Sequence, residues 1–297
     1  MLIKIGSRKS KLAIIQTNLV IEKIKQHFPQ IECRIIPITT TGDMITHRTL
    51  HDIGGKVLFL KEIEQQLLEK KIDIAVHSLK DMPGIMPNGL IVGAVLEQID
   101  SRDTFFSFKY RSLEELPMNA IIGSSSVRRK IFLSRIRSDF RVVLFRGNVD
   151  SRIDKVEKGE VDCTILGMEG LKRLNLYDKK YCQAIDPSKM LPAVGQGVIG
   201  IEVCSDDRAM KEICKQINHI PTWQKMEVER SFLEHLDADC RVPLAANSKL
   251  KGNIIKTDFM MASESGDNIV FHSEAGNISD ARSIGIRAAK YMLNLIK

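Results

Sequence analysis

Residues 72–83 read Ile72-Asp73-Ile74-Ala75-Val76-His77-Ser78-Leu79-Lys80-Asp81-Met82-Pro83, and this stretch indicates a fold class and a site together. Its first half is a short apolar run, the pattern of a buried strand in a parallel sheet. Its second half places four polar side chains directly after that run, His77, Ser78, Lys80 and Asp81, before Pro83 prevents a longer strand. Open α/β sheets bind ligands at the carboxyl ends of such strands. A polar loop in which Lys80 and Asp81 meet solvent or each other gives the same pattern.

Length and composition indicate a globular protein of two or three domains. The chain has 297 residues, of which 43% are hydrophobic and 27% charged, as in ordinary globular proteins. Its N-terminal apolar run is too short for a signal peptide, and no apolar run approaches the roughly 20 residues of a membrane span. We therefore expect a cytoplasmic protein with no membrane association.

Basic residues recur where a predicted strand meets a predicted helix. The first cluster, Arg8, Lys9 and Lys11, follows a strand at 2–5 and begins a helix that extends to about residue 26. Three later strands are followed in the same way by Arg128, Arg129 and Lys130, by Arg146 and Arg152, and by Lys172 and Arg173.

These junctions are unusual because the N-terminus of a helix normally prefers negative charge. Cations are reasonable there when an anion joins them, and guanidinium groups bind carboxylates bidentately. Any single cluster is explained by solvated charge. The repetition at one type of junction predicts a binding site for a ligand with many carboxylates.

Strands and helices alternate along the first two thirds of the chain, which predicts two α/β units. A return strand at 198–203 then leads to helices near 205–217 and 222–236, strands near 253–262 and 268–273, and a final helix near 279–296. This last β-β-α order predicts a small α+β unit. We expect domain 1 at 1–98 and 191–217, domain 2 at 99–190 and domain 3 at 218–297.

The six cysteines are scattered and form no CxxC pair, which argues against zinc and against a disulfide framework. Cys240 differs from the others because it lies in a polar loop between Asp239 and Arg241. A loop thiol is either an inert residue or, once deprotonated, a nucleophile. The net charge of +7 accompanies only 5% aromatic residues and no basic tail, so we expect no nucleic-acid partner.

Nine motifs, in order along nearly the whole chain, resemble the hydroxymethylbilane synthase family, also called porphobilinogen deaminase. They are GSRKSKLA at 6–13, TTGD at 40–43, GGK at 54–56, LFLKEIE at 58–64, DIAVHSLKDMP at 73–83, GSSSVRRK at 123–130, RGNVDSR at 146–152, GLKRL at 170–174 and LPAVGQG at 191–197. The loop DCRVP at 239–243 resembles the cofactor-attachment segment of that family. The sequence departs from the family pattern at Thr41, Asp52 and Val57, which bears on lid motion and chain accommodation.

The resemblance implies an enzyme, a transferase of porphyrin and heme biosynthesis. The family condenses four porphobilinogen molecules head to tail, releases ammonia and yields the linear tetrapyrrole hydroxymethylbilane. The product grows on a covalent dipyrromethane cofactor, which the resemblance places on Cys240 through a thioether. It also implies two α/β domains like those of periplasmic binding proteins, a small α+β C-terminal domain, no metal, and a monomer whose partners are porphobilinogen and the growing polypyrrole chain.

By the same resemblance, Asp81 is the catalytic residue. The residues that resemble binders of the cofactor carboxylates are Lys80, Ser126, Arg128, Arg129 and Arg173. Those that resemble contacts to substrate and chain are Arg8, Ser10, Arg146, Arg152 and, on a long loop interpreted as a lid, Lys56. Phe59 either stacks beside the pyrroles or packs in the core from its own helix.

Two other classes of protein are compatible with parts of the pattern. A two-domain module that binds anionic solutes would use the same strand-end cations without catalysis or a covalent adduct, but the export signal usual for such modules is absent. A nucleic-acid binder is supported only by the net charge, and its duplex affinity would depend steeply on salt.

Overall fold

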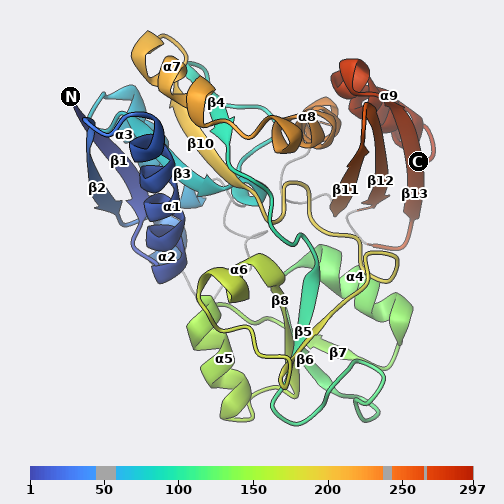
Figure 1. The fold of residues 1–297 in the computed structure, drawn as a ribbon. Coiled ribbons are helices and arrows are strands. Elements are labelled where there is room, and N and C mark those ends of the chain that lie inside the picture. Colours follow the sequence, from blue (N-terminus) through green and yellow to red (C-terminus); the bar gives the residue numbers. More distant parts are fainter. Residues whose placement is uncertain (45–57, 237–242, 264–265, 297) are drawn as a thin grey trace.

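The chain forms three β-sheets, each with helices packed against it (Figure 1). The computed structural model describes residues 1–44, 58–236, 243–263 and 266–296. Two of the sheets are five-stranded and the third, formed late in the chain, is three-stranded. This arrangement confirms the predicted class of two α/β units followed by a small α+β unit.

The first sheet contains the strand predicted within residues 72–83. Its strand order is β2-β1-β3-β10-β4. The strands are β1 (Leu2–Arg8), β2 (Glu32–Ile38), β3 (Ile74–Ser78), β4 (Leu90–Val95) and β10 (Ile199–Cys204). The apolar run of β3 is buried and lies parallel to β1, as predicted, but β3 pairs with β10 in the antiparallel direction. The sheet is therefore mixed, because β10 returns from the second sheet instead of following a crossover helix.

Helices cover both faces of this sheet. They are α1 (Lys11–His27), α3 (Lys61–Leu68) and α7 (Arg208–Ile217). One apolar cluster joins the sheet to α1 and α7 through residues such as Ile5, Val76 and Ile201. A second cluster joins it to α3 through Ile63 and Leu67. The two apolar faces explain why residues 74–76 of β3 are all apolar instead of alternating with polar residues.

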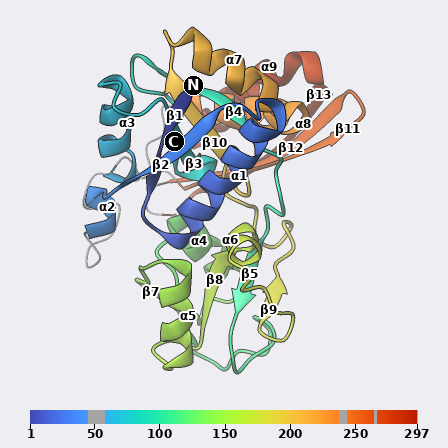
Figure 2. The ribbon, with the colours of Figure 1, turned by 60° about the vertical axis from the view of Figure 1, so that its left-hand side comes forward.

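The second sheet has the strand order β7-β6-β8-β5-β9. Its strands are β5 (Asp103–Phe106), β6 (Ile121–Gly123), β7 (Arg141–Val143), β8 (Cys163–Gly167) and β9 (Cys182–Ala184). Its helices are α4 (Val127–Ile136), α5 (Val149–Glu157) and α6 (Met168–Arg173). Strand β6 is parallel to β7 and β8, so the loops after these three strands emerge at one edge. Figures 1 and 2 show α6 at the side of this sheet that faces the first sheet.

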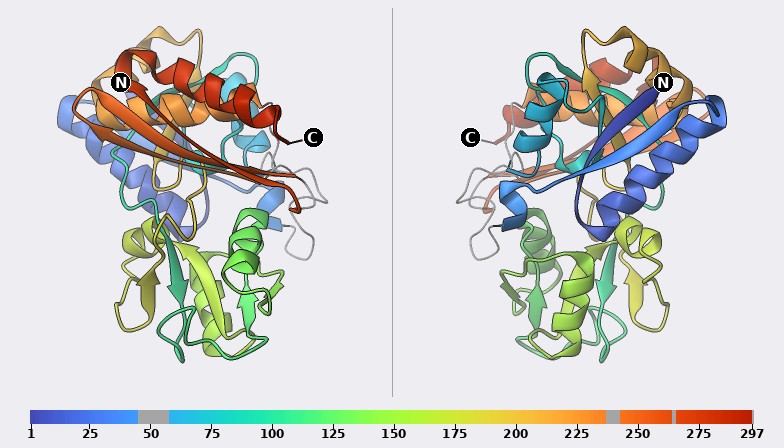
Figure 3. Two further views of the ribbon diagram at one scale, coloured as in Figure 1. Left: turned by 90° about the vertical axis from the view of Figure 1, so that its right-hand side faces the viewer. Right: turned by 90° about the vertical axis from the view of Figure 1, so that its left-hand side faces the viewer.

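The third sheet is antiparallel and consists of β11 (Leu244–Lys251), β12 (Ile254–Ala262) and β13 (Ile269–Asn277). Helices α8 (Ile220–His235) and α9 (Ala281–Leu293) lie over one of its faces (Figure 3). The prediction of two strands was incomplete, because it missed β11. The first half of β11 reads Leu-Ala-Ala-Asn-Ser, which has low strand propensity, and its burial against α8 outweighs that propensity.

Two segments connect the first and second sheets, one before β5 and one before β10 (Figure 1). They are bonded to each other, since the Gln98 side chain donates to the Gln196 carbonyl and the Gln196 side chain donates to the Ser101 carbonyl. Gly197 has φ of +88°, and a Cβ there would lie 2.7 Å from the Ile99 carbonyl oxygen. Only glycine allows this close approach of the two segments.

Candidate active site

The polar end of β3 continues as a single 3-10 turn, η3 (Leu79–Asp81). The Leu79 amide donates to the Val198 carbonyl, and the buried Leu79 side chain packs with Met82 and Val198. This packing holds the turn in place while Lys80 and Asp81 remain half-buried. The predicted catalytic carboxylate therefore lies at the end of a rigid, buried strand.

Arg152, from the second sheet, is an electrostatic neighbour of Asp81. Burial lowers the pKa of Arg152 to about 10, repulsion from Arg129 and Arg146 adds to this, and attraction to Asp81 opposes it. Burial also lowers the pKa of Arg146. The Arg152 Nε donates to the Gly147 carbonyl at 2.9 Å, which fixes that guanidinium at the start of α5. Four predicted site residues from separate segments are thus electrostatic neighbours.

Arg128 and Arg129 lie in the first turn of α4, and both are buried. Both guanidinium groups contact Asp103, at 2.7 and 2.8 Å. Burial alone would raise the pKa of Asp103, but attraction to the two arginines outweighs it and lowers the pKa to about 2. The sequence argument missed Asp103, although each guanidinium has five N–H donors and can serve both a structural partner and a ligand.

Lys80 and Arg173 share an acidic neighbour that sequence reasoning also missed. The Lys80 ammonium donates to Glu169, a buried residue of α6, so this ion pair connects the two large sheets. The Arg173 Nη2 donates to the Gly197 carbonyl at 2.9 Å, whereas its Nη1 is buried with no hydrogen-bond partner. Glu169 gave no signal in the sequence, because an acidic residue in the first turn of a helix is common.

Arg8, predicted to contact substrate, is placed differently from the other cations. Its guanidinium forms an ion pair with Asp43 of α2 (Thr41–Met44) and lies 4.3 Å from the centre of the Phe59 ring. Asp43 also accepts from the Thr40 hydroxyl. Most of the TTGD motif at 40–43 lies in this one-turn helix. Phe59 therefore supports Arg8, a contact that neither of its two predicted roles included.

The two predicted serines begin helices. The Ser10 hydroxyl accepts from the Ala13 amide at the start of α1, and the Ser126 hydroxyl accepts from the Arg129 amide at the start of α4. Both contacts are N-caps, which stabilise the helices by satisfying an amide that lacks an intrahelical partner. Each serine keeps its hydroxyl hydrogen as a donor.

Several predictions lie outside the described residues. They concern the cofactor cysteine Cys240, the loop lysine Lys56 and the sequence departures at Asp52 and Val57. Thr41, the third departure, is described, and its hydroxyl and amide both contact the Glu62 carboxylate.

The described residues fit a ligand with several carboxylates. Arg152 of α5 is an electrostatic neighbour of Asp81, Arg129 and Arg146, Lys80 pairs with Glu169 of α6, and Arg173 carries a buried N–H that has no hydrogen-bond partner. Buried polar groups without a partner are rare and costly, so such an atom points to a ligand. The fold and the site together define a class of protein, an α/β protein with a cation-rich site between two sheets.

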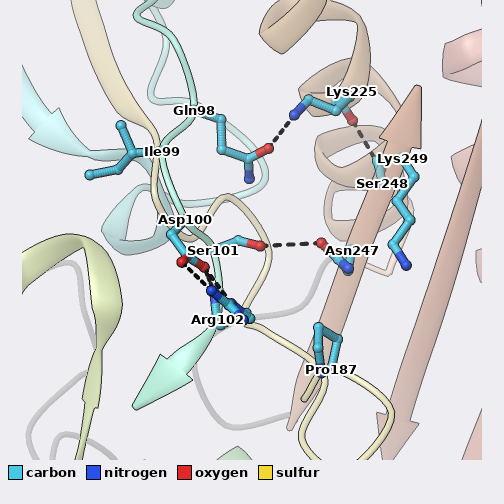
Figure 4. A pocket seen from close by; sticks show the side chains of 10 residues that line it. All are labelled: Gln98, Ile99, Asp100, Ser101, Arg102, Pro187, Lys225, Asn247, Ser248 and Lys249. Carbon is cyan, nitrogen blue, oxygen red and sulfur yellow. Dashed lines mark hydrogen bonds and ion pairs between the residues drawn. The ribbon is translucent and has the colours of Figure 1, made fainter. Parts of the chain in front are cut away.

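A pocket of about 420 Å³ lies elsewhere, beside the segments that connect the sheets. Figure 4 shows it between Asp100 and Arg102 on one side and Asn247 of β11 on the other. None of the predicted site residues lines it. This pocket results from the packing of the connecting segments. The cluster of charged site residues is therefore a better guide to the active site than the pocket is.

Comparisons with known proteins identify the family. Residues 3–212 match the family model described as porphobilinogen deaminase, dipyromethane cofactor binding domain, and residues 223–294 match porphobilinogen deaminase, C-terminal domain. A porphobilinogen deaminase of Rickettsia canadensis is 59% identical over 293 residues, which cover 98% of this chain and 97% of that protein. The chain belongs to the porphobilinogen deaminase family.

Two further porphobilinogen deaminases are similar to this chain over nearly its whole length. The protein of Rickettsia typhi is 58% identical over 292 residues, covering 98% of both chains. The protein of Rickettsia conorii is 50% identical over 345 aligned positions, covering 99% of this chain and 98% of that protein. The predicted family, transferase activity, pathway and dipyrromethane cofactor are confirmed.

Solved structures with low sequence identity were also found. The methionine-binding protein MetQ is 12% identical, with a TM-score of 0.47 and coverage of 75% of this chain and 90% of that chain. The effector-binding domain of BenM with benzoate is 12% identical, with a TM-score of 0.44 and coverage of 76% and 94%. Within the described residues, no helix combines the length and apolarity needed to cross a bilayer.

Proposed function

We propose that Asp81 performs the catalysis of a porphobilinogen-condensing transferase, hydroxymethylbilane synthase. The observation that carries this proposal is the position of its carboxylate, at the end of a buried strand and among cations of the opposite sheet. The buried strand and the packed turn after it hold this carboxylate in a fixed place, as charge stabilisation and proton transfer both require.

The chemistry proposed for Asp81 has two parts. The aminomethyl group of porphobilinogen takes up a proton and leaves as ammonia, so the C–N bond breaks and an electron-poor azafulvene remains. The Asp81 carboxylate, placed near the pyrrole N–H, stabilises the positive charge that develops. When the next C–C bond has formed, the same carboxylate accepts the proton that the coupled ring carbon loses.

The cations select the substrate by its acetate and propionate arms. Arg146 and Arg152 would hold the incoming substrate and growing chain, because Arg152 interacts electrostatically with both Asp81 and Arg146. Arg8, the last residue of β1, and Ser10, the N-cap of α1, are also proposed to contact the substrate and the growing chain. Lys56 is proposed to contact them from its loop. Bidentate guanidinium–carboxylate contacts supply orientation as well as affinity.

Lys80, Ser126, Arg128, Arg129 and Arg173 are proposed to hold the carboxylates of the dipyrromethane, which Cys240 attaches through a thioether. The buried, unpartnered N–H of Arg173 supports this assignment. When bound, the dipyrromethane supplies the pyrrole carbon on which the product grows.

We propose that three domains share this work, with boundaries at 1–98 with 191–217, at 99–190 and at 218–297. The apolar clusters support them, because each sheet has a cluster of its own, although that of the second sheet also includes Ala245, Met260 and Ala262 of the third. We also propose that the chain acts as a monomer in the cytoplasm, without nucleic acid, as the family resemblance implies. Light scattering, cell fractionation and titration with duplex DNA would test these three statements.

The intact mass of the purified protein tests the proposed function. We expect a mass increase equal to two linked pyrrole units, and peptide mapping should locate it on Cys240. Protein that is purified without the adduct should gain it when porphobilinogen is added, and Cys240→Ser should not. If the mass of the wild-type chain does not change, the alternative of a binding module without catalysis takes its place.

A further inference from the structure

Glu169 is a carboxylate inside the proposed cofactor site. It lies in the first turn of α6, directly after β8, and only 4% of its surface is exposed. Its Oε1 accepts from the Lys80 ammonium of the opposite sheet. Lys80 is adjacent to Asp81, so a negative charge of the protein itself sits beside the catalytic centre.

Some hydrogen-bonding groups at and near Glu169 have no partner. Its Oε2 is buried with no hydrogen-bond partner, and so is the Nη1 of Arg173. Burial lowers the pKa of Arg173, and attraction to Glu169 opposes that shift. Burial likewise lowers the pKa of Arg128, where Glu169 is again one of the groups that oppose it. The Glu169 carboxylate therefore interacts with three cations, Lys80, Arg128 and Arg173. One of its oxygens and one N–H group of Arg173 remain buried without a hydrogen bond, which is costly.

Gly167 provides the space that this carboxylate occupies. A Cβ on Gly167 would lie 2.6 Å from Glu169 Oε1 and 2.7 Å from its Cδ, far closer than carbon atoms approach. The backbone of Gly167 has φ of −73° and ψ of 131°, which alanine adopts without strain. Glycine is needed here for the side chain of Glu169 and not for its own conformation.

We propose that Glu169 is an internal competitor for the cofactor, a residue that determines how readily the site accepts its carboxylates. Before loading, it neutralises Lys80 and reduces the positive charge at Arg128 and Arg173. The acetate and propionate groups of dipyrromethane have the same chemistry and require the same cations. Loading must therefore break the contact between Lys80 and Glu169. This inference rests on the proposed function.

The test compares cofactor acquisition by wild type and Glu169→Gln. Both proteins are produced without adduct, in a host unable to make porphobilinogen, and are then mixed with porphobilinogen while intact mass is followed over time. We expect Glu169→Gln to load about tenfold faster, the effect of removing one charged hydrogen bond. Its unloaded form should melt at a lower temperature, and loading should raise that temperature more than in wild type. Glu157→Gln, an exposed residue of α5, is the matched control and should load like wild type.

Gly167→Ala provides a second route that keeps the charge in the chain. The added methyl group should expel the Glu169 carboxylate, so this variant should also load faster than wild type. In a Glu169→Ala background the same Gly167→Ala change should have no further effect, because nothing remains to be expelled.

The outcomes separate this inference from the function on which it rests. If wild type gains no adduct, the proposed function fails. If wild type loads but Glu169→Gln loads equally fast or more slowly, the competitor role is wrong and the ion pair is structural. Should Glu169→Gln not fold, Gly167→Ala decides alone, and a wild-type loading rate for it would overturn the inference.

Discussion

At the end of β3, one carboxylate is proposed to do the chemistry, and replacing it tests this directly. Asp81→Asn keeps the size of the side chain but removes its charge and its capacity to accept a proton. Turnover should fall about 10²–10⁴-fold, the usual contribution of general acid–base catalysis, while the cofactor still attaches. Steady-state kinetics and intact mass measure the two effects.

Asp73→Asn is the control for that experiment, because Asp73 lies at the opposite end of β3 and accepts from the Lys4 amide. It should keep the wild-type rate. If Asp81→Asn also kept that rate, Asp81 would have no part in the reaction.

Arg146 tests the binding of carboxylates. Arg146→Leu should lose about 1.5–3 kcal/mol of charged hydrogen bonding, so we expect kcat/KM to fall roughly ten- to a hundredfold. Arg141→Leu changes the same residue type at the other, exposed end of β7 and should have little effect. Unaltered kinetics for Arg146→Leu would contradict a polycarboxylate site.

Two buried glutamates, one in α3 and one in α8, make the stability of the protein depend on pH. Burial raises the pKa of Glu64 in α3 to about 7, repulsion from Glu202 adds to this, and His77 opposes it. Burial raises the pKa of Glu229 in α8 to about 7 as well, but Glu229 accepts from the Gly195 and Ser248 amides, each at 2.9 Å. The same pKa thus arises in two different environments.

Ionisation of either glutamate lowers the stability of the folded state, but replacement by glutamine should have different effects at the two positions. A raised carboxyl pKa means that the folded state binds more protons than the unfolded state, so stability falls as pH rises from about 4.5 towards 7. Glu64→Gln cannot ionise, so it should be more stable than wild type at pH 8 and similar at pH 4.5. Glu229→Gln should be less stable at both, because its amide cannot accept from two N–H groups with both of its terminal atoms. Urea unfolding at several pH values measures this, and equal behaviour of the two variants would refute the distinction.

At the scale of the whole molecule, Asp103 joins the second sheet to the segment that returns to the first sheet. It begins β5, binds Arg128 and Arg129, and accepts from Gln196 of the returning segment at 3.1 Å. Asp103→Asn leaves two buried guanidinium groups without their counter-charge, so the free energy of unfolding should fall by about 3–5 kcal/mol.

Urea denaturation measures this loss. The stabilisation by Asp103 is present above the unfolded pKa of 3.8 and lost as pH falls towards 2. Glu114→Gln removes an exposed ion pair with Lys189 and should change stability by about 1 kcal/mol or less. If both variants changed stability equally, the Asp103 network would not hold the molecule together.

Much of this site could be predicted because topology brings strand ends together. Parallel strands β6, β7 and β8 each end in a cationic junction, so the positions of Arg128, Arg146 and Arg173 at one edge followed from the sequence pattern. The acidic partners could not be predicted in the same way. Lys80 and Glu169 are 89 residues apart, and no local spacing indicates that they meet.

The sequence by itself determined the class of fold and the family and predicted the place of catalysis, because apolar runs specify strands and polar residues that can carry chemistry follow those runs. Only the tertiary structure decided which charges pair. It showed that Asp103 already holds Arg128 and Arg129, that Asp43 holds Arg8, and that Glu169 pairs with Lys80. Ion pairs depend on distance in space and on burial, and both arise only when sheets that are remote in sequence pack against each other.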